Sequence, residues 1–378
     1  MVVFIEPLGK PFAHLSVVKS MLFAELNDDL NSNEILFISS LDYFNSIPEN
    51  FRNKLKFKEI KVTESSILNI FEIALIVISA FFNNWKIKNI KVYLLFSKSY
   101  SNIILKFLSF FFLSKKKRLY VLLHGELQNV TLKGSRSIRL DGRAQRLLYW
   151  LDTKFSSNLK FVIISEFVFE KLKMSLGYNP LNFISIDLPY LYDGKKERTK
   201  QNTKELVVST VGVNSTNKKS FLLNNIASNF EDKIKSGALM ICTSGRNDDV
   251  LFSELIDTPN MGSHYLLSTE EYAKRINSSD VLVFFNDDNY SLISSGSYFD
   301  CINFEKPILA MKNEQWEYNF KQFGDIGYLC NNIDEIYGHI NSLLINNEYL
   351  NVFSRNLEIA RDNSSIEKCI PYFMSKFQ

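Results

Sequence analysis

The residues of this chain that are best suited to chemistry lie in the segment SSGSYFDCINFEKP, residues 294–307. Small residues open the segment, at Ser295, Gly296 and Ser297, and the free backbone N–H groups at a helix start bind anions. Asp300 follows one turn later, where a carboxylate would meet sugar hydroxyls. The segment therefore suits a nucleotide diphosphate. An ordinary strand-to-helix turn with a serine cap is the alternative interpretation.

Two further loops supply positive charge. The sequence VVSTVGVNSTNKKSF contains Gly212, Lys218 and Lys219, and CTSGRNDD contains Arg246. When a sugar leaves a nucleotide diphosphate, negative charge grows on the departing diphosphate, and lysine, arginine or a helix N-terminus can stabilise it without a metal. We expect Lys218 to be the main stabilising group, and Lys219 and Arg246 are the next candidates. Solvated loop charges are the alternative.

Transfer to a hydroxyl with inversion also needs a base, and histidine and carboxylate side chains are suitable. The candidates are His14, in EPLGKPFAH, and His124 with Glu126, which follow the apolar run LYVLL. All three belong to loops that come after expected strands. A histidine beside an apolar strand is also commonly a hydrogen-bonded packing residue, and this alternative stays open.

Composition excludes several classes of protein. The 378 residues predict about two to three domains. Net charge is only +3, from 44 basic and 41 acidic residues, so no overall field marks a nucleic-acid binder. The four cysteines form no CxxC pair, which indicates neither a zinc site nor a disulfide framework and fits a reducing cytoplasm. The first 15 residues lack the features of a secretory signal, so we expect no export.

Alternating apolar runs predict an α/β protein with parallel sheets. Strands are expected at 2–5, 35–38, 56–62, 92–96, 119–124, 161–165, 206–211, 238–242, 263–267, 281–285, 307–311 and 327–329. Helices are expected at 16–26, 66–83, 99–113, 144–152, 219–235, 269–277, 297–304 and 333–344.

A charged run, GKKERTKQNTKE, separates two such series and predicts an interdomain linker. We therefore expect one domain at 1–191, a second at 206–348, and a helical tail at 349–378 that packs back on the first. The apolar segments 67–82 and 103–113 are shorter than the roughly 20 residues of a membrane-spanning helix, and we interpret them as core helices.

Basic residues cluster in the first half of the chain. Arg136, Arg139, Arg143 and Arg146 would share one face of a helix, and Lys115–Arg118 is a run of four basic residues. Such groups suit an anionic, lipid-linked acceptor or acidic headgroups at the inner face of a membrane. A solvated basic face is the alternative.

The second half resembles the nucleotide-sugar domain of GT-B glycosyltransferases, in particular the bacterial group that builds surface polysaccharides. In that family a strand ends in a glycine that is followed six residues later by a lysine, as Gly212 and Lys218 are placed here. A later segment has two acidic residues before Lys-Pro and a buried strand, and SSGSYFDCINFEKPIL has Asp300 at the second of them. STEEYAKRINSSDVLVFF, residues 268–285, is similar to the family's helix and apolar strand. The match covers roughly the last 170 residues.

One position departs from the family. Leu292 stands where the first acidic residue is usual, which puts a retaining mechanism and the identity of the sugar in doubt. Asp287 and Asp288 lie nearby and could take part of that role, although paired aspartates after a strand are commonly solvated turn residues.

The resemblance implies a GT-B fold, with two Rossmann-like domains whose parallel sheets face each other across a cleft. It implies a glycosyltransferase of hexosyltransferase type that needs no metal and acts in the biosynthesis of O-antigen or capsule. The resemblance also implies that the protein is cytoplasmic or peripheral on the inner face of the cytoplasmic membrane. The nucleotide sugar is the donor substrate, the acceptor is a glycan or lipid-linked, and neither a cofactor nor nucleic acid is expected. A nucleotide-sugar epimerase of similar fold and a catalytically degenerate binding protein are the alternatives.

Overall fold

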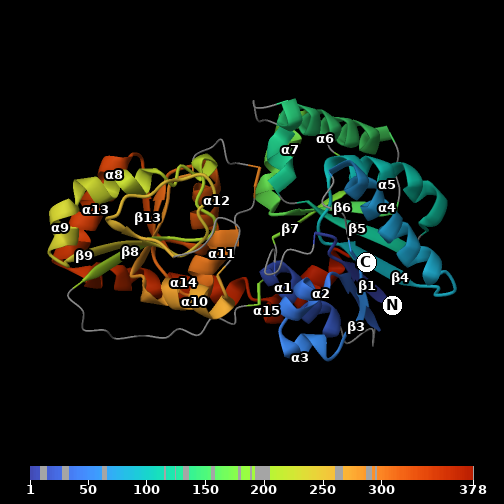
Figure 1. The fold of residues 1–378 in the computed structure, drawn as a ribbon, viewed down its shortest axis with the longest axis horizontal. Helices are drawn as coiled ribbons and strands as arrows, with labels where there is room; N and C mark the ends of the chain where they lie inside the picture. Colours follow the sequence, from blue (N-terminus) through green and yellow to red (C-terminus); the bar gives the residue numbers. More distant parts are fainter. Residues whose placement is uncertain are drawn as a thin grey trace. The chain divides into compact units, whose positions relative to one another are not determined.

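The chain, described here from a computed structural model, forms two compact units (Figure 1). Unit 1 comprises Met1–Leu191, Leu292–Ser294 and Ile366–Gln378, and unit 2 comprises Tyr192–Ser291 and Ser295–Ser365. The structure describes residues 1–8, 15–27, 34–61, 66–114, 116–123, 125–130, 136–154, 158–177, 180–187, 190–191, 205–259, 267–286, 292–293 and 296–377.

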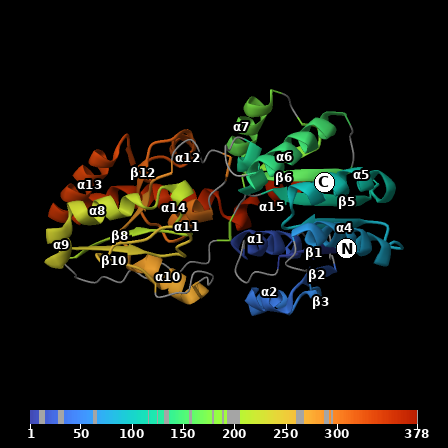
Figure 2. The ribbon, with the colours of Figure 1, turned by 45° about the horizontal axis from the view of Figure 1, so that its top comes forward.

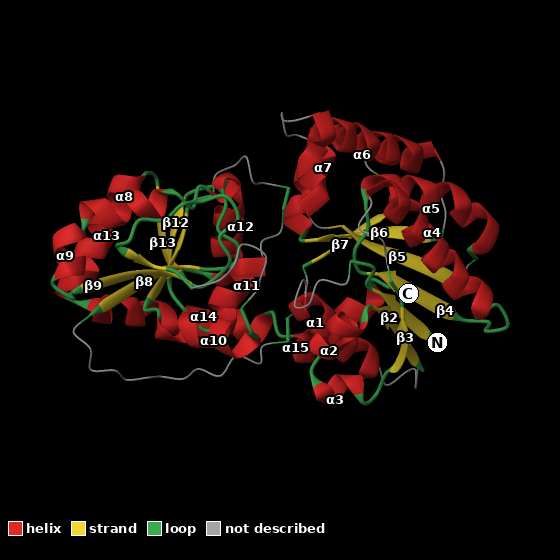
Figure 3. Cartoon of the chain, in the orientation of Figure 1, coloured by secondary structure: helices red, strands yellow, loops and turns green. Residues whose placement is uncertain are grey.

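Unit 1 contains a seven-stranded parallel sheet in the order β3-β2-β1-β4-β5-β6-β7 (Figure 3). The inner strand β1 has the sequence VVFI and is buried on both faces, as expected where helices cover both sides. The strands are β1 (Val2–Ile5), β2 (Ile35–Ser39), β3 (Lys56–Glu59), β4 (Ile90–Leu94), β5 (Lys117–Leu123), β6 (Leu159–Ile164) and β7 (Phe183–Ile186). The helices are α1 (Leu15–Leu26), α2 (Leu41–Ser46), α3 (Glu49–Arg52), α4 (Ser66–Asn83), α5 (Ser99–Phe112), the 3-10 helix η1 (Gly125–Val130), α6 (Arg136–Lys154), α7 (Glu166–Leu176) and α15 (Ile366–Ser375).

The two faces of this sheet have different cores. On one face Phe4, Tyr93 and Tyr120 stack in a row, and the ring of Phe377 packs edge-on against the two tyrosines. The Tyr120 hydroxyl donates a hydrogen bond to the Phe377 carbonyl at 2.7 Å. Helix α15 packs against α1 on this side. The other face packs against α4 to α7, and Figure 2 shows α6 and α7 on the side of the sheet away from α1 and α2.

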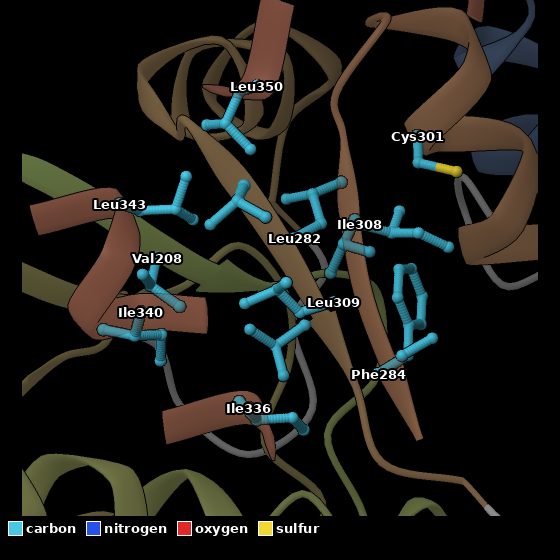
Figure 4. Close-up of a cluster of buried hydrophobic side chains, with 14 of the residues drawn as sticks. Val208, Leu282, Phe284, Cys301, Ile308, Leu309, Ile336, Ile340, Leu343 and Leu350 are labelled. Atoms are coloured by element: carbon cyan, nitrogen blue, oxygen red, sulfur yellow. The ribbon is translucent and has the colours of Figure 1, made fainter. Parts of the chain in front are cut away.

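Unit 2 contains a six-stranded parallel sheet in the order β10-β9-β8-β11-β12-β13. Its core joins strand residues such as Val208, Leu282 and Leu309 to Ile336 and Ile340 of a covering helix (Figure 4). The strands are β8 (Leu206–Thr210), β9 (Leu239–Thr243), β10 (Ile256–Asp257), β11 (Val281–Phe284), β12 (Ile308–Met311) and β13 (Gly327–Cys330). The helices are η2 (Thr216–Lys218), α8 (Leu222–Asn229), α9 (Glu231–Lys235), α10 (Thr269–Ser278), α11 (Gly296–Asn303), α12 (Glu314–Phe323), α13 (Ile333–Ile345), η4 (Asn347–Phe353) and α14 (Ser354–Asn363).

The predicted fold class is confirmed: both sheets are parallel and lie between helices. Some predicted elements differ from the structure. The helix expected at 219–235 is divided, because Lys219 has a left-handed φ of 55° and Phe230 separates α8 from α9. Helix α6 begins at Arg136 rather than at residue 144, so the four arginines belong to one helix. The strand expected at 263–267 and the linker expected at 192–205 lie outside the described residues, except for residues 205 and 267.

The tail expected at 349–378 is divided between the two units. Residues up to Ser365, including α14, belong to unit 2, and Ile366 onward belongs to unit 1. The reason is that Leu357 and Ala360 of α14 are buried in the core of unit 2, whereas Phe377 covers the aromatic row of unit 1. No helix among the described residues is long and apolar enough to span a membrane.

Candidate functional site

Gly212, Lys218 and Ser297 meet just beyond the end of β8. Gly212 has a φ of +74°, in the left-handed region that favours glycine. A Cβ atom placed on Gly212 would lie 2.1 Å from the Ser297 Oγ and 3.8 Å from the Lys218 Nζ. The turn that follows β8 therefore carries the lysine back to the first turn of α11, where Ser297 is buried.

The loop after β9 packs directly against the Gly212 turn. A Cβ atom on Gly245 would lie only 1.8 Å from the Gly212 carbonyl oxygen, so the two backbones are in contact. The Asn214 N–H donates to the Arg246 carbonyl at 2.7 Å, and the Asp248 N–H donates to the Asn214 carbonyl at 3.0 Å. These bonds extend the parallel pairing of β8 and β9 beyond the strands and fix both loops.

Lys218 is half-buried at the end of η2. Burial lowers the pKa of its ammonium group to about 8, and the nearby carboxylates of Asp300 and Asp248 act in the opposite direction. Asp300, on α11, accepts a hydrogen bond of 2.6 Å from the Tyr272 hydroxyl of α10. The lysine is thus a partly dehydrated cation that has carboxylates nearby.

A small, partly open hollow lies beside Lys218 at the ends of β8 and β11. In the sheet, β8 pairs with β9 on one side and with β11 on the other, so the order of the strands reverses direction between β8 and β11. Open α/β sheets bind ligands at such switch points. Among the described residues, the buried Thr210 Oγ1 has no hydrogen-bond partner. The walls are Thr210, Val211, Val213, Asn214, Lys218, Ser220, Val283, Phe284, Phe285 and Asn286. Apolar walls with a few polar groups are typical of small-molecule sites.

The other predicted donor-site residues differ in their surroundings. Arg246 forms a two-point ion pair with Asp248, with N–O distances of 2.5 and 3.0 Å, so a carboxylate already neutralises its charge. Lys219 occupies the left-handed C-cap of η2, next to Lys218. Gly296 is the first residue of α11, and Ser295 lies outside the described residues.

The candidate bases belong to unit 1. His14 and His124 lie outside the described residues. Glu126 belongs to η1, and its side chain is not described. Asp287 and Asp288 also fall outside the described part of the chain.

Leu292, at the position where the resemblance leads one to expect a first acidic residue, is a core residue of unit 1. Its side chain is buried in the cluster formed by β1, β4, β5 and α4, and its N–H donates to the Gln128 Oε1 at 3.0 Å. A carboxylate would be desolvated in this apolar setting, which gives a physical reason for leucine here.

Sequence reasoning missed Tyr272, Gly245 and Thr210. Tyr272 lies in STEEYAKR, whose charged residues indicate an exposed helix and give no sign of the bond to Asp300. Thr210 ends an apolar strand and Gly245 follows one. Ligand sites of parallel sheets lie at the carboxyl ends of strands, so this position could have marked both residues as candidates.

Comparison of the sequence with protein-family models and with curated proteins gives no significant match. Solved structures match the fold. A glycosyltransferase from Rickettsia africae is 9% identical with a TM-score of 0.59, covering 99% of this chain and 96% of that one. TarM is 14% identical with a TM-score of 0.55, and the match covers 87% of this chain but only 60% of TarM. A UDP-GlcNAc 2-epimerase from Neisseria meningitidis, bound to UDP-GlcNAc, is 10% identical with a TM-score of 0.52, covering 100% of this chain and 99% of that one.

Proposed function

We propose that this chain, which has the GT-B fold, binds a nucleotide diphosphate sugar in unit 2 and transfers the sugar to an acceptor. The convergence of Gly212, Lys218 and Ser297 beside the hollow carries this proposal. A glycine turn, a cation and a helix start gathered at one switch point suit a diphosphate. The epimerase of similar fold holds a UDP-sugar, which supports the same class of ligand.

The chemistry assigns a role to each group. The first turn of α11 and Lys218 receive the diphosphate, and Asp300, held by Tyr272, receives hydroxyls of the ribose or the sugar. The bond between the sugar C1 and the diphosphate oxygen breaks, and its electron pair leaves with the diphosphate. The acceptor oxygen bonds to C1 and its proton passes to a base. Charged Lys218 stabilises the negative charge that grows on the leaving group.

The finer assignments belong to the same proposal. Glu126, His124 and His14 are the candidate bases, and the reaction is a metal-independent hexosyl transfer. The acceptor is a lipid-linked glycan of a bacterial surface polysaccharide, which brings the protein to the inner face of the cytoplasmic membrane. Replacing the true base should lower kcat strongly while the affinity for the donor stays unchanged.

The donor site is tested by calorimetry with a panel of nucleotide sugars. Lys218→Met and Asp300→Asn should each weaken binding about tenfold or more, because each removes a charge-assisted contact. Lys235→Met, at an exposed lysine of α9, is the matched control and should bind as the parent does. Unchanged affinity in both site variants would refute the site.

An epimerase is the second candidate, favoured by the match to the Neisseria enzyme. Incubating the donor alone distinguishes the two reactions, because epimerisation changes the NMR spectrum of the sugar with no acceptor present. Transfer requires the acceptor. Binding of the donor without either reaction would instead indicate a degenerate binding protein.

A further inference from the structure

Helix α5 of unit 1 has an unusual distribution of polar and aromatic side chains. Beside the buried Leu105 it buries several polar side chains, Ser101, Asn102, Lys106 and Ser109. Lys106 pairs with the fully buried Asp152 of α6 at 2.5 Å, which satisfies the charge inside the protein. Its exposed side chains are instead aromatic: Tyr100, Phe107, Phe110 and Phe111. A helix that faces only water usually exposes polar side chains and buries its apolar ones.

Helix α4 exposes a similar stripe. Phe71, Leu75 and Phe82 are exposed at spacings of four and seven residues, so they share one side of the helix. Trp85 follows the helix and is 66% exposed, and Phe111 on α5 is 86% exposed. Large aromatic side chains at such exposures are unusual for a surface that faces only water.

The two stripes belong to neighbouring helices. Helix α4 packs against α5, and α5 packs against α6, on the same side of the sheet (Figure 1). The Lys117 Nζ donates to the Trp85 carbonyl at 3.3 Å, which joins the segment after α4 to the segment after α5. We call these exposed residues the α4–α5 apolar face: Phe71, Leu75, Phe82, Trp85, Tyr100, Phe107 and Phe111.

Charge near this face is almost entirely positive. The sequences of α4 and α5 contain one acidic residue, Glu72, and one basic residue, the buried Lys106. Exposed lysines follow the two helices, at Lys86 and Lys88 after α4 and at Lys116 after α5. Aromatic and aliphatic side chains bordered by lysines are typical of helices that lie in a membrane interface.

We propose that the α4–α5 apolar face binds the surface of an anionic lipid bilayer, with both helices lying in the interface plane. A second copy of the chain is a poorer occupant, because a two-fold contact pairs each patch with itself and would bring the two sets of lysines together. Anionic headgroups complement the lysines, while the acyl boundary covers the aromatic rings. The inference uses no residue of the donor site, so its test is independent of the proposed transfer.

The first experiment is co-sedimentation of the whole chain with vesicles, without donor or acceptor. The chain should bind vesicles of phosphatidylcholine mixed with phosphatidylglycerol more tightly than phosphatidylcholine alone. The variant Phe107→Ser/Phe111→Ser should lower the partition coefficient about tenfold or more, since two exposed aromatic side chains that would enter the interface are lost. The matched control, Leu251→Ser/Ile345→Ser, removes two exposed apolar side chains of unit 2 and should bind as the parent does.

The second experiment tests the charge. Lys86→Glu/Lys88→Glu should lower binding about tenfold on the anionic vesicles and little on neutral ones, because each lysine contributes near the surface. Lys54→Glu/Lys58→Glu changes net charge equally at exposed positions of unit 1 and should have a much smaller effect. Circular dichroism confirms that each variant folds.

Three outcomes would overturn the inference. The parent chain could fail to sediment with anionic vesicles, or the site and control variants could bind equally. Light scattering could also show a dimer that the phenylalanine variant dissociates while vesicles bind nothing, which would make the face a subunit interface.

Discussion

Replacing Gly212 by alanine should destabilise unit 2 more than the same change at Gly237. Both glycines have nearly the same left-handed φ, +74° and +72°, so both alanines carry the same backbone strain. They differ in their surroundings. A Cβ atom on Gly237 meets nothing within 4 Å, whereas a Cβ atom on Gly212 would lie 2.1 Å from the Ser297 Oγ.

The expected magnitudes follow from this difference. Gly237→Ala should lower the free energy of unfolding by about 1 kcal/mol, which is the left-handed strain less the entropy gained from the unfolded chain. Gly212→Ala should lower it by a further 1–3 kcal/mol or so, the usual range for overpacking. Ser297→Ala removes the colliding oxygen and leaves the Ser297 Cβ at 3.4 Å, in ordinary contact. The double variant should therefore recover about 1–2 kcal/mol.

Urea unfolding of the whole chain measures these changes. The chain has three tryptophans, and the changes Trp85→Phe and Trp150→Phe leave only Trp316. Trp316 is buried in unit 2, where its ring centroid lies 4.8 Å from that of Phe284. Its fluorescence reports the unfolding of that unit, and a constant m-value checks the comparison. Equal losses for the two glycine variants, or no recovery in the double variant, would refute the close approach of the Gly212 turn to α11.

Four further predictions concern charge and hydrogen bonding. The affinity for UDP should fall as pH rises through about 8, where Lys218 loses its proton, and Lys218→Met should flatten that dependence in calorimetry. The same lowered pKa should make the free energy of unfolding rise between about pH 8 and the unfolded-state pKa of 10.5, because in that range Lys218 binds more protons in the unfolded chain than in the folded one. Urea titrations of Lys218→Met should lack this rise. Tyr272→Phe should weaken donor binding about three- to tenfold by releasing Asp300, and an unchanged Kd would contradict that role. Lys106→Met should lower the free energy of unfolding by about 3–5 kcal/mol, because Asp152 stays buried without its cation; a loss below 1 kcal/mol in urea unfolding would count against this.

Much of the fold could be predicted from the sequence, because buried strands and amphipathic helices leave local patterns. The apolar run VVFI gives β1, and helix α4 has the predicted bounds, 66–83. Short or mixed segments were missed. Strand β7 has four residues with two only half-buried. Helix α12, EQWEYNFKQF, is short and rich in charged residues, although Trp316, Phe320 and Phe323 recur at helical spacing and pack on the core.

The candidate site was less accessible to sequence reasoning. The spacing of Gly212, Lys218 and Ser297 indicated groups that the structure brings together, because each follows a strand or begins a helix at the same edge of a sheet. Tyr272 and Leu292 could not be predicted in this way. The partner of the first and the burial of the second depend on contacts between distant segments, which no local pattern records. The roles of Asp300 and of the candidate bases stay predictions.

The path of the chain between the two units bears on how the protein folds during synthesis. The first 191 residues belong to unit 1, but later residues complete it: Leu292 fills part of its core, and Phe377 covers Tyr93 and Tyr120. A nascent chain therefore completes unit 2 while the aromatic row of the earlier sheet is still uncovered. Unit 1 is therefore translated first but completed last. Until residues 366–378 emerge, its exposed aromatic surface is open to aggregation and to binding by chaperones.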